Sequence, residues 1–122
     1  NIAIRNPEIY KTVSAFAPIS NPTKGIWGQK QFEAYLGKET ENWKKYDPSI
    51  LLNEQGYIGK ILIDQGTKDD FLKNLMPEVL EKIFNNRNNG DQLRYQKDYD
   101  HSYFFVSSFL KDHVLWHKDN VK

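Results

Sequence analysis

The seven residues "KILIDQG", from Lys60 to Gly66, constrain the fold of this chain more than any other stretch. Ile61, Leu62 and Ile63 follow one another without a polar interruption, and Gly66 closes the run. A strand that reads as a continuous apolar run is buried on both faces, which is typical of a parallel sheet covered by helices on either side. The segment therefore predicts a central strand and requires helices elsewhere in the chain.

The remaining segments supply those helices in alternation with two further strands. Pro7 falls where it would end or bend a helix over 2–10, and Asp47 and Pro48 have the residue types of a helix cap and a first helical position. The other expected elements are a strand over 13–17, a loop over 20–28, helices over 29–39, 41–46 and 47–53, a helix over 75–90, a strand over 91–100 and a helix over 102–119. This alternation predicts an α/β protein with a mostly parallel sheet, formed by one domain over 1–122.

The composition excludes several classes of function. The chain has 17 basic and 16 acidic side chains, and a formal charge of +1 gives no electrostatic reason to expect nucleic acid or an anionic membrane as a partner. No run approaches the roughly 20 apolar residues of a membrane span. The absence of cysteine excludes a disulfide scaffold, a thiolate nucleophile and cysteine-ligated zinc, and it is consistent with a reducing cytosol. Because the chain begins "NIAIRNPEIY", without Met and within an expected helix, we expect it to be part of a longer protein.

His101 is the first candidate for chemistry, in the run "KDYDHSYFFVSSFL". It lies in the loop between an expected strand and an expected helix. In parallel α/β folds the functional residues usually lie in the loops that follow the carboxyl ends of the strands. An unperturbed imidazole titrates near pH ~6.5, which suits a general base. Asp100 and Ser102 cannot complete a triad by adjacency, because neighbouring side chains in an extended segment point to opposite sides. Ser102 is better placed to cap the following helix. The alternative is that His101 is a surface or capping histidine.

The loop after the central strand offers three carboxylates, in "DQGTKDDF". Asp64 ends the strand, and Asp69 and Asp70 lie in the loop beyond it. Loops at the carboxyl ends of neighbouring parallel strands lie side by side, so an aspartate in this loop can reach His101 and hold its imidazole in one tautomer. The alternative is that these aspartates are solvated turn residues.

His113 and His117 are four residues apart on the last expected helix, so they share one of its faces. No third ligand stands at the spacing of a zinc-protease motif, and we therefore expect a partly exposed helical surface and no metal. No basic stripe accompanies the tryptophans, which favours core or loop packing over nucleic-acid stacking for Trp27, Trp43 and Trp116. The sequence contains no glycine-rich phosphate loop.

Five blocks of the sequence resemble one known family. "VSAFAPISNP", "GIWGQKQFEAYLG", "WKKYDPS", "ILIDQGTKDDFL" and "YDHSYFFVSSFLKDH" are similar, in this order, to successive blocks of the S-formylglutathione hydrolases, also called esterase D. The resemblance covers nearly all 122 residues. It implies an α/β-hydrolase fold and hydrolysis of the thioester S-formylglutathione to formate and glutathione, with side activity on small carboxylic esters. It also implies a cytoplasmic, commonly dimeric enzyme that needs no metal or other cofactor.

The resemblance assigns functional residues by position. The histidine of "YDHSY" is the family's general base, which implies that role for His101. The aspartate three residues after the glycine of "DQG" is the family's acid, which implies that role for Asp69, with Asp70 as the second choice. The order of acid and base is that of α/β-hydrolases. The family places its "WG" block in a loop above the sheet, which implies that Trp27 lies near the substrate.

The family's nucleophile is absent from the sequence. The elbow G-x-S-x-G, which carries the nucleophilic serine and part of the oxyanion hole, occurs nowhere in the chain. We therefore expect a C-terminal portion of the domain that lacks the N-terminal strands and the elbow, and that is inactive and prone to associate by itself. Two alternatives stay open. One is a feruloyl-esterase-like carboxylesterase with the same acid and base, and the other is a non-catalytic interaction domain if the chain is complete.

Overall fold

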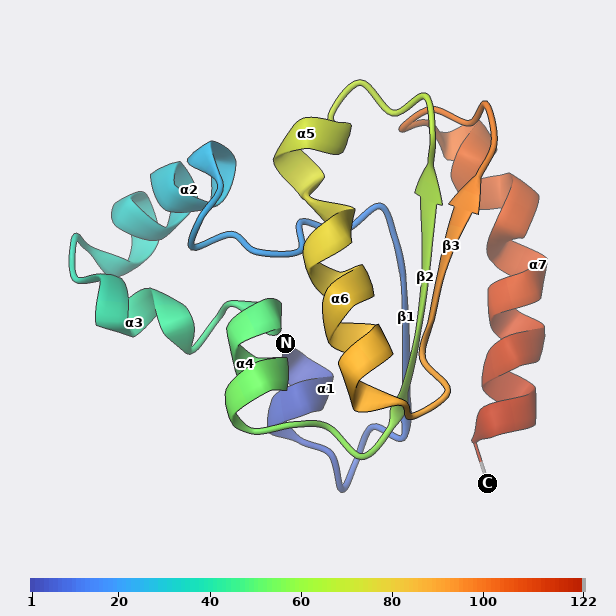
Figure 1. The fold of residues 1–122 in the computed structure, drawn as a ribbon, viewed down its shortest axis with the longest axis horizontal. Coiled ribbons are helices and arrows are strands. Elements are labelled where there is room, and N and C mark those ends of the chain that lie inside the picture. The colour runs from blue at the N-terminus through green and yellow to red at the C-terminus, as the bar shows by residue number, and fades with distance from the viewer. Residues whose placement is uncertain (122) are drawn as a thin grey trace.

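The computed structural model describes residues 1–121, so the predicted domain boundary at 122 lies just outside the described residues (Figure 1). Helices and strands alternate along the chain, as the hydrophobic pattern predicts. The elements are α1 (Ile2–Arg5), β1 (Thr12–Phe16), α2 (Ile26–Leu36), α3 (Thr40–Lys44), α4 (Pro48–Glu54), β2 (Lys60–Gly66), α5 (Leu72–Leu75), α6 (Pro77–Arg87), β3 (Gln92–Gln96) and α7 (Tyr103–Asn120).

The sheet consists of three parallel strands in the order β1-β2-β3. The central position of β2 is seen at Ile63, which pairs with Ala15 of β1 and with Leu93 of β3. Every residue of β2 after Lys60 is buried. The predicted central strand and the parallel sheet are therefore confirmed.

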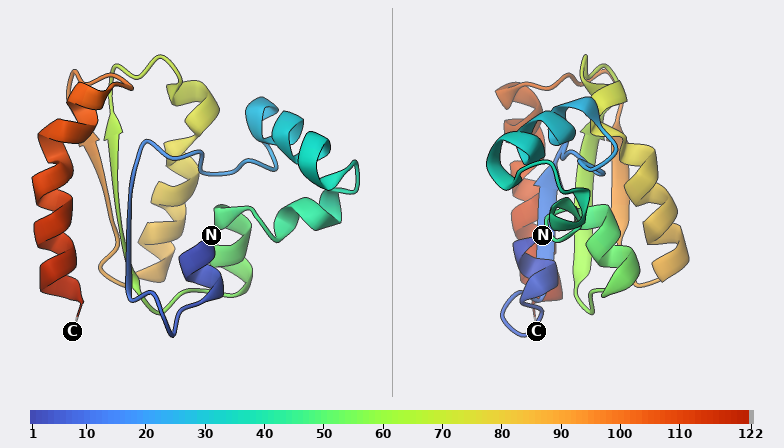
Figure 2. Two further views of the ribbon diagram at one scale, coloured as in Figure 1. Left: turned by 180° about the vertical axis from the view of Figure 1, so that it is seen from behind. Right: turned by 90° about the vertical axis from the view of Figure 1, so that its left-hand side faces the viewer.

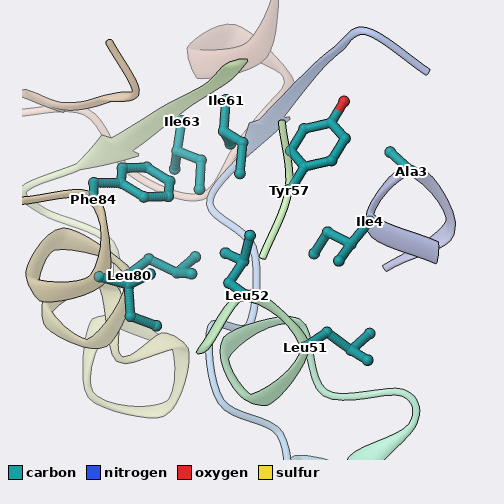
Figure 3. Packing of buried hydrophobic residues seen from close by; sticks show 10 residues of the cluster. Ala3, Ile4, Leu51, Leu52, Tyr57, Ile61, Ile63, Leu80 and Phe84 are labelled. Atoms are coloured by element: carbon teal, nitrogen blue, oxygen red, sulfur yellow. The ribbon is translucent and has the colours of Figure 1, made fainter. Parts of the chain in front are cut away.

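Helices cover both faces of this sheet (Figures 1 and 2). On one face α7 packs against β1 and β2, and on the other face lie α1, α4 and α6. The larger apolar core, part of which is seen in Figure 3, fills the space between these three helices and β2, and its buried residues are Ala3, Ile4, Leu51, Leu52, Tyr57, Ile61, Ile63, Leu80, Ile83 and Phe84. Burying one such large apolar side chain contributes about 1.5–3 kcal/mol, so this core anchors the central strand. The two helices α2 and α3 extend away from the sheet (Figure 1).

The start of α4 has the cap that the sequence predicts. The Asp47 carboxylate accepts hydrogen bonds from the backbone N–H groups of Ser49 and Ile50, and Pro48 occupies the first turn. These bonds satisfy N–H groups that have no partner within the helix. Among the described residues, no helix combines the length and the apolar character needed to cross a bilayer.

Several predicted boundaries were wrong. The helix expected over 2–10 is shorter and ends at Arg5, although its end just before Pro7 confirms that this proline ends or bends it. The helix expected over 75–90 is α6, but it begins at Pro77 and ends at Arg87, because Met76 before it and Asn88 after it adopt left-handed conformations (φ 52° and φ 47°). The strand expected over 91–100 ends at Gln96.

The loop expected over 20–28 is also wrong at its end, since α2 begins at Ile26. The prediction rested on the density of turn formers, including Gly25 and Gly28. Gly28 has a different function, because a Cβ atom there would lie 2.4 Å from the Cα of Pro22. This glycine permits close packing of the helix on the preceding loop and does not form a turn.

The strand β1 is half-buried along its length, not buried as predicted. It is an outer strand of the described sheet, with β2 as its partner there. The reason for the difference is that an apolar run is fully buried only when the strand has neighbours on both sides as well as covered faces.

Candidate active site

Two loops meet at the carboxyl end of the sheet, one after β2 and one after β3 (Figure 1). The Thr67 N–H donates to the carbonyl oxygen of Gln96 at 3.0 Å, and the Lys68 N–H donates to that of Tyr99 at 2.9 Å. The Asp98 N–H donates to Thr67 Oγ1 at 2.9 Å. These bonds fix the position of one loop relative to the other.

Gly66, the last residue of β2, permits this close approach. A Cβ atom at this position would lie 2.3 Å from the carbonyl oxygen of Tyr99 and 2.8 Å from its carbonyl carbon. Because backbone atoms cannot yield as a flexible side chain can, any other residue would push the loop after β3 away. The glycine of the "DQG" motif therefore sets the separation of the two loops.

Asp69 and His101 lie on these two loops and are hydrogen-bonded to each other. The distance from Asp69 Oδ2 to His101 Nδ1 is 2.7 Å. The side chain of Asp69 is fully buried, whereas 41% of the His101 side chain is exposed. A carboxylate on Nδ1 favours the tautomer with its proton there, so Nε2 is presented as a base. The structure thus brings together the two residues that the sequence singles out.

Two further donors hold the Asp69 carboxylate. The Phe71 N–H donates to Oδ1 at 2.8 Å, and Gln65 Nε2 donates to Oδ2 at 3.0 Å. Sequence reasoning missed both donors. The available signal for Gln65 was a polar residue inside a buried run, four positions before the aspartate. The alternative of a solvated turn residue is wrong for Asp64 and Asp69, which are buried, whereas Asp70 is exposed.

The sequence neighbours of His101 do not form a triad with it. The Ser102 hydroxyl caps α7, accepting from the Phe105 N–H, and this predicted role is confirmed. Asp100 is exposed.

A groove of about 450 Å³ opens beside His101. Phe16 and Ala17 line it from the end of β1, and Tyr103 and Val106 line it from the start of α7. A largely apolar groove with a few polar groups at its wall, here including His101 and Tyr103, is the usual form of a site for a small molecule.

A chain of two aromatic contacts leads from His101 to Phe71 and from Phe71 to Trp27. The Phe71 ring meets the His101 ring edge-on, with centroids 5.3 Å apart, and Trp27 meets Phe71 at 5.1 Å. Trp27 and Phe71 are 39% and 40% exposed, so a bound molecule can reach both. Trp27 lies on the first turn of α2 and not in a loop, which corrects the expectation about its setting.

Asp64 belongs to a buried ion cluster below the site. Arg94 donates from Nε to Oδ1 and from Nη2 to Oδ2, both at 2.6 Å, and His113 Nε2 lies 3.0 Å from Oδ2. Burial by itself raises the pKa of Asp64, but the hydrogen bonds from Arg94, His113 and Gln96 outweigh it and hold this pKa below its ordinary value. The cluster joins β2, β3 and α7.

The expectation of a partly exposed surface is wrong for His113, which is 2% exposed. Its ring stacks on Phe16 with centroids 3.9 Å apart. Phe105, Phe109 and His113 follow at intervals of four along α7, and this spacing places them on the face toward the sheet.

His117 bonds to two hydroxyl groups of β1. Its Nδ1 lies 2.8 Å from Thr12 Oγ1 and its Nε2 lies 2.8 Å from Ser14 Oγ. Burial, with a smaller contribution from His113, lowers the pKa of His117. Within residues 1–121, no group of three or more His, Cys, Asp or Glu side chains is arranged to hold a metal ion.

The site can therefore act as a general base oriented by a buried carboxylate. His101 Nε2 can take a proton from a hydroxyl group presented to it, and Asp69 can stabilise the imidazolium that results.

Comparisons with known sequences identify the family of this chain. A family model described as "Putative esterase" matches residues 1–116. The S-formylglutathione hydrolase of Paracoccus denitrificans (strain Pd 1222) is 50% identical over 120 residues. That match covers 98% of this chain and 43% of the relative, so the chain spans less than half of the relative's length.

Solved structures lead to the same family. An S-formylglutathione hydrolase from Agrobacterium tumefaciens matches with a TM-score of 0.92 at 39% identity, over 99% of this chain and 44% of its own. FphF, a fluorophosphonate-binding serine hydrolase of Staphylococcus aureus, matches with a TM-score of 0.68 at 20% identity, over 94% of this chain and 47% of its own, and supports the fold alone. The predicted α/β-hydrolase fold is confirmed. The chain belongs to the esterase family, a family of hydrolases, over nearly its whole length.

Proposed function

We propose that this chain supplies the acid and the base of a serine-type hydrolase that converts S-formylglutathione to glutathione and formate. The observation that carries the proposal is the 2.7 Å hydrogen bond between the buried Asp69 and the partly exposed His101. The 50% identity to the S-formylglutathione hydrolase of P. denitrificans supports the choice of substrate. In this proposal the nucleophilic serine and the oxyanion hole belong to a part of the protein outside these 122 residues.

The first half of the reaction transfers the formyl group to the enzyme. His101 Nε2 takes the proton of the serine hydroxyl while the serine oxygen attacks the thioester carbonyl carbon. The tetrahedral intermediate then expels the sulfur of glutathione, and the imidazolium gives its proton to that sulfur. The products of this step are glutathione as a free thiol and a formyl ester of the serine.

The second half of the reaction releases formate. His101 takes a proton from water, and the hydroxide attacks the formyl ester carbonyl. The serine leaves as its alkoxide and recovers the proton from the imidazolium. Each cycle thus consumes one water and leaves the enzyme unchanged.

The surroundings of His101 suit this sequence of steps. The Asp69 carboxylate stabilises the imidazolium twice in each cycle, and it is fully buried, where a charge interaction is stronger than in water. We assign the aromatic pair Trp27 and Phe71 to substrate binding, because both rings are partly exposed, Phe71 contacts His101 and Trp27 contacts Phe71. We further propose that the complete protein acts in the cytoplasm as a homodimer, without a metal or other cofactor.

The experiment compares thioester with ester turnover by the complete protein. We expect S-formylglutathione to be hydrolysed with a larger kcat/KM than p-nitrophenyl acetate or a feruloyl ester. Hydrolysis of the thioester is measured by the release of glutathione. His101→Ala is expected to lower kcat by about 10⁶-fold, the scale of a lost triad histidine. As a matched control, His117→Gln removes a histidine outside the site and is expected to leave kcat within about twofold.

Two results would contradict the proposal. A larger kcat/KM on feruloyl or other aryl esters than on the thioester would favour a carboxylesterase with the same acid and base. Full turnover by His101→Ala would remove His101 from the chemistry and favour an interaction domain for this part of the protein.

A further inference from the structure

Gln65 is a fully buried amide at the second-last position of the central strand β2. Its Nε2 donates to Asp69 Oδ2 at 3.0 Å and to the carbonyl oxygen of Gly66 at 3.2 Å. Its Oε1 is also buried, and it has no hydrogen-bond partner among residues 1–121. The mechanism above makes no use of this side chain.

The unpaired Oε1 indicates what fixes the orientation of this amide. The oxygen and nitrogen of an amide exchange places by a half-turn of the group. After such a turn, Oε1 would face the Asp69 carboxylate and the Gly66 carbonyl, which are both acceptors, and both hydrogen bonds would be lost. The amide therefore keeps an orientation that satisfies the carboxylate, at the expense of its own oxygen.

Gln65 and His101 donate to the same oxygen, Asp69 Oδ2, while the Phe71 N–H donates to the other. Of these three donors, Gln65 alone belongs to the sheet, where it pairs with Tyr95 of β3. Its bond to Asp69 thus fixes a loop carboxylate relative to a rigid strand. Supporting contacts of this kind determine how precisely a catalytic group is held.

We propose that Gln65 is a positioning residue for the hydrolase of the preceding section, on whose proposed function this inference rests. Its amide N–H fixes Asp69 Oδ2 where the His101 Nδ1–H meets it. Without this donor the carboxylate can turn, and the His101 ring is no longer held in one orientation.

The neighbouring strand offers a matched control in Gln96. Its Nε2 donates to Asp64 Oδ1 at 3.2 Å, and Asp64 is also fully buried. The other partners of Asp64 are Arg94 and His113, not His101. Each glutamine therefore gives one hydrogen bond to a buried aspartate, and only Gln65 gives it to the proposed dyad.

The first test uses Gln65→Leu and Gln96→Leu in the complete protein, with thermal unfolding as the check of folding. We expect both variants to lose stability, and Gln65→Leu to lose more, because Gln65 is fully buried and also donates to the carbonyl oxygen of Gly66. We expect only Gln65→Leu to lower kcat, by about 10- to 100-fold as for a lost bond to a charged group, with KM nearly unchanged. Equal kcat values for the two leucine variants would overturn the proposal.

The second test uses Gln65→Glu, which keeps the shape of the side chain. Two carboxyl groups at hydrogen-bond distance cannot easily both ionise, so the introduced carboxyl group can donate to Asp69 while it holds a proton. We expect the kcat of Gln65→Glu, relative to the wild type, to be highest at low pH and to fall as the introduced carboxyl group ionises. Gln96→Glu is expected to show no such trend, and a ratio independent of pH for Gln65→Glu would count against the proposal.

A third readout separates this inference from the proposed function. The ¹⁵N NMR shifts of the His101 ring report which nitrogen carries the proton, whatever the substrate. We expect the neutral Nδ1–H form in the wild type and a mixture of tautomers in Gln65→Leu. An unchanged His101 spectrum in Gln65→Leu would overturn the positioning role. A changed spectrum in a protein that hydrolyses neither thioester nor ester would support the positioning role and reject the proposed function.

Discussion

Arg94 meets the fully buried carboxylate of Asp64 through two parallel hydrogen bonds, each 2.6 Å long. A guanidinium matches a carboxylate in this two-point geometry, which gives the pair a defined orientation as well as energy. His113 adds a third bond from α7 at 3.0 Å. The cluster thereby holds β2, β3 and α7 together directly below the loops that carry Asp69 and His101.

Removal of Arg94 should therefore destabilise the protein. Arg94→Leu leaves Asp64 buried without its strongest partner. We expect a loss of about 3 kcal/mol in the free energy of unfolding. This value is at the lower end for a broken buried ion pair, because the Arg94 side chain is 33% exposed. Urea unfolding of the complete protein measures the change. Lys38→Leu, which removes an exposed pair with Glu33, is the control and should cost less than about 1 kcal/mol. Similar costs for the two variants would contradict a stabilising role of the cluster.

Acidification should weaken the packing of α7 on β1 through His117. Because the pKa of His117 is lowered in the folded state, the unfolded chain binds a proton first as the pH falls. The contribution of the neutral His117 ring to stability is fully present above pH ~6.5, the ordinary pKa of histidine. It is lost as the pH falls below that value toward the lowered pKa of the folded state. We expect His117→Gln to show a smaller decrease in melting temperature than the wild type over this interval. Lys118→Gln on the same helix should retain the wild-type decrease, and an equal decrease in both variants would exclude His117 as its source.

The two neighbouring aspartates of the loop after β2 should differ sharply in their effect on turnover. Asp69→Asn can present an amide N–H to His101 Nδ1 and thereby favour the wrong tautomer, which is expected to lower kcat by about 10⁴-fold. Asp70 is exposed, and Asp70→Asn should leave kcat within about twofold. Steady-state kinetics of the two variants decide between them. The assignment of the acid is wrong if Asp70→Asn is the damaging change.

The close approach of the two loops should depend on Gly66. In Gly66→Ala the new methyl group meets the Tyr99 carbonyl, so the loop after β3 has to move. Because a displacement of about 1 Å can lower kcat by about 100-fold, we expect a loss of this size. Gly37→Ala is the control for backbone effects. At φ 82° it introduces strain of about 1–3 kcal/mol, but its Cβ meets no atom of residues 1–121 within 4 Å, so it should reduce stability without a change in kcat. Wild-type kcat in a folded Gly66→Ala would contradict this role of the glycine.

The parts of the fold that follow from local pattern could be predicted from the sequence. The apolar run from Ile61 to Ile63 identified the central strand, and the residue types of Asp47 and Ser102 identified two helix caps. Each of these features depends on residues within a few positions of one another. The burial of β1 could not be predicted, because it depends on which strands lie beside it.

The partners of the buried polar groups could not be predicted either. His113 is bonded to Asp64, 49 positions earlier, and no local pattern specifies that pair. In a strand buried on both faces, the apolar pattern does not identify the face toward which Gln65 projects. The pairing of Asp69 with His101 was accessible from sequence because both loops follow neighbouring parallel strands and because the surrounding blocks resemble a known family.

The main-chain bonds between the two loops make the Asp69–His101 distance independent of the length of the turn at the other end of the sheet. The acid and the base are separated by 32 positions, but their distance is set by the pairing of β2 with β3 and by the bonds from Thr67 and Lys68. The turn between α6 and β3 lies at the opposite end of the sheet (Figure 1). Insertions or deletions in that turn would change the sequence interval and leave the Asp69–His101 geometry intact, so related chains can vary in length there without loss of the dyad.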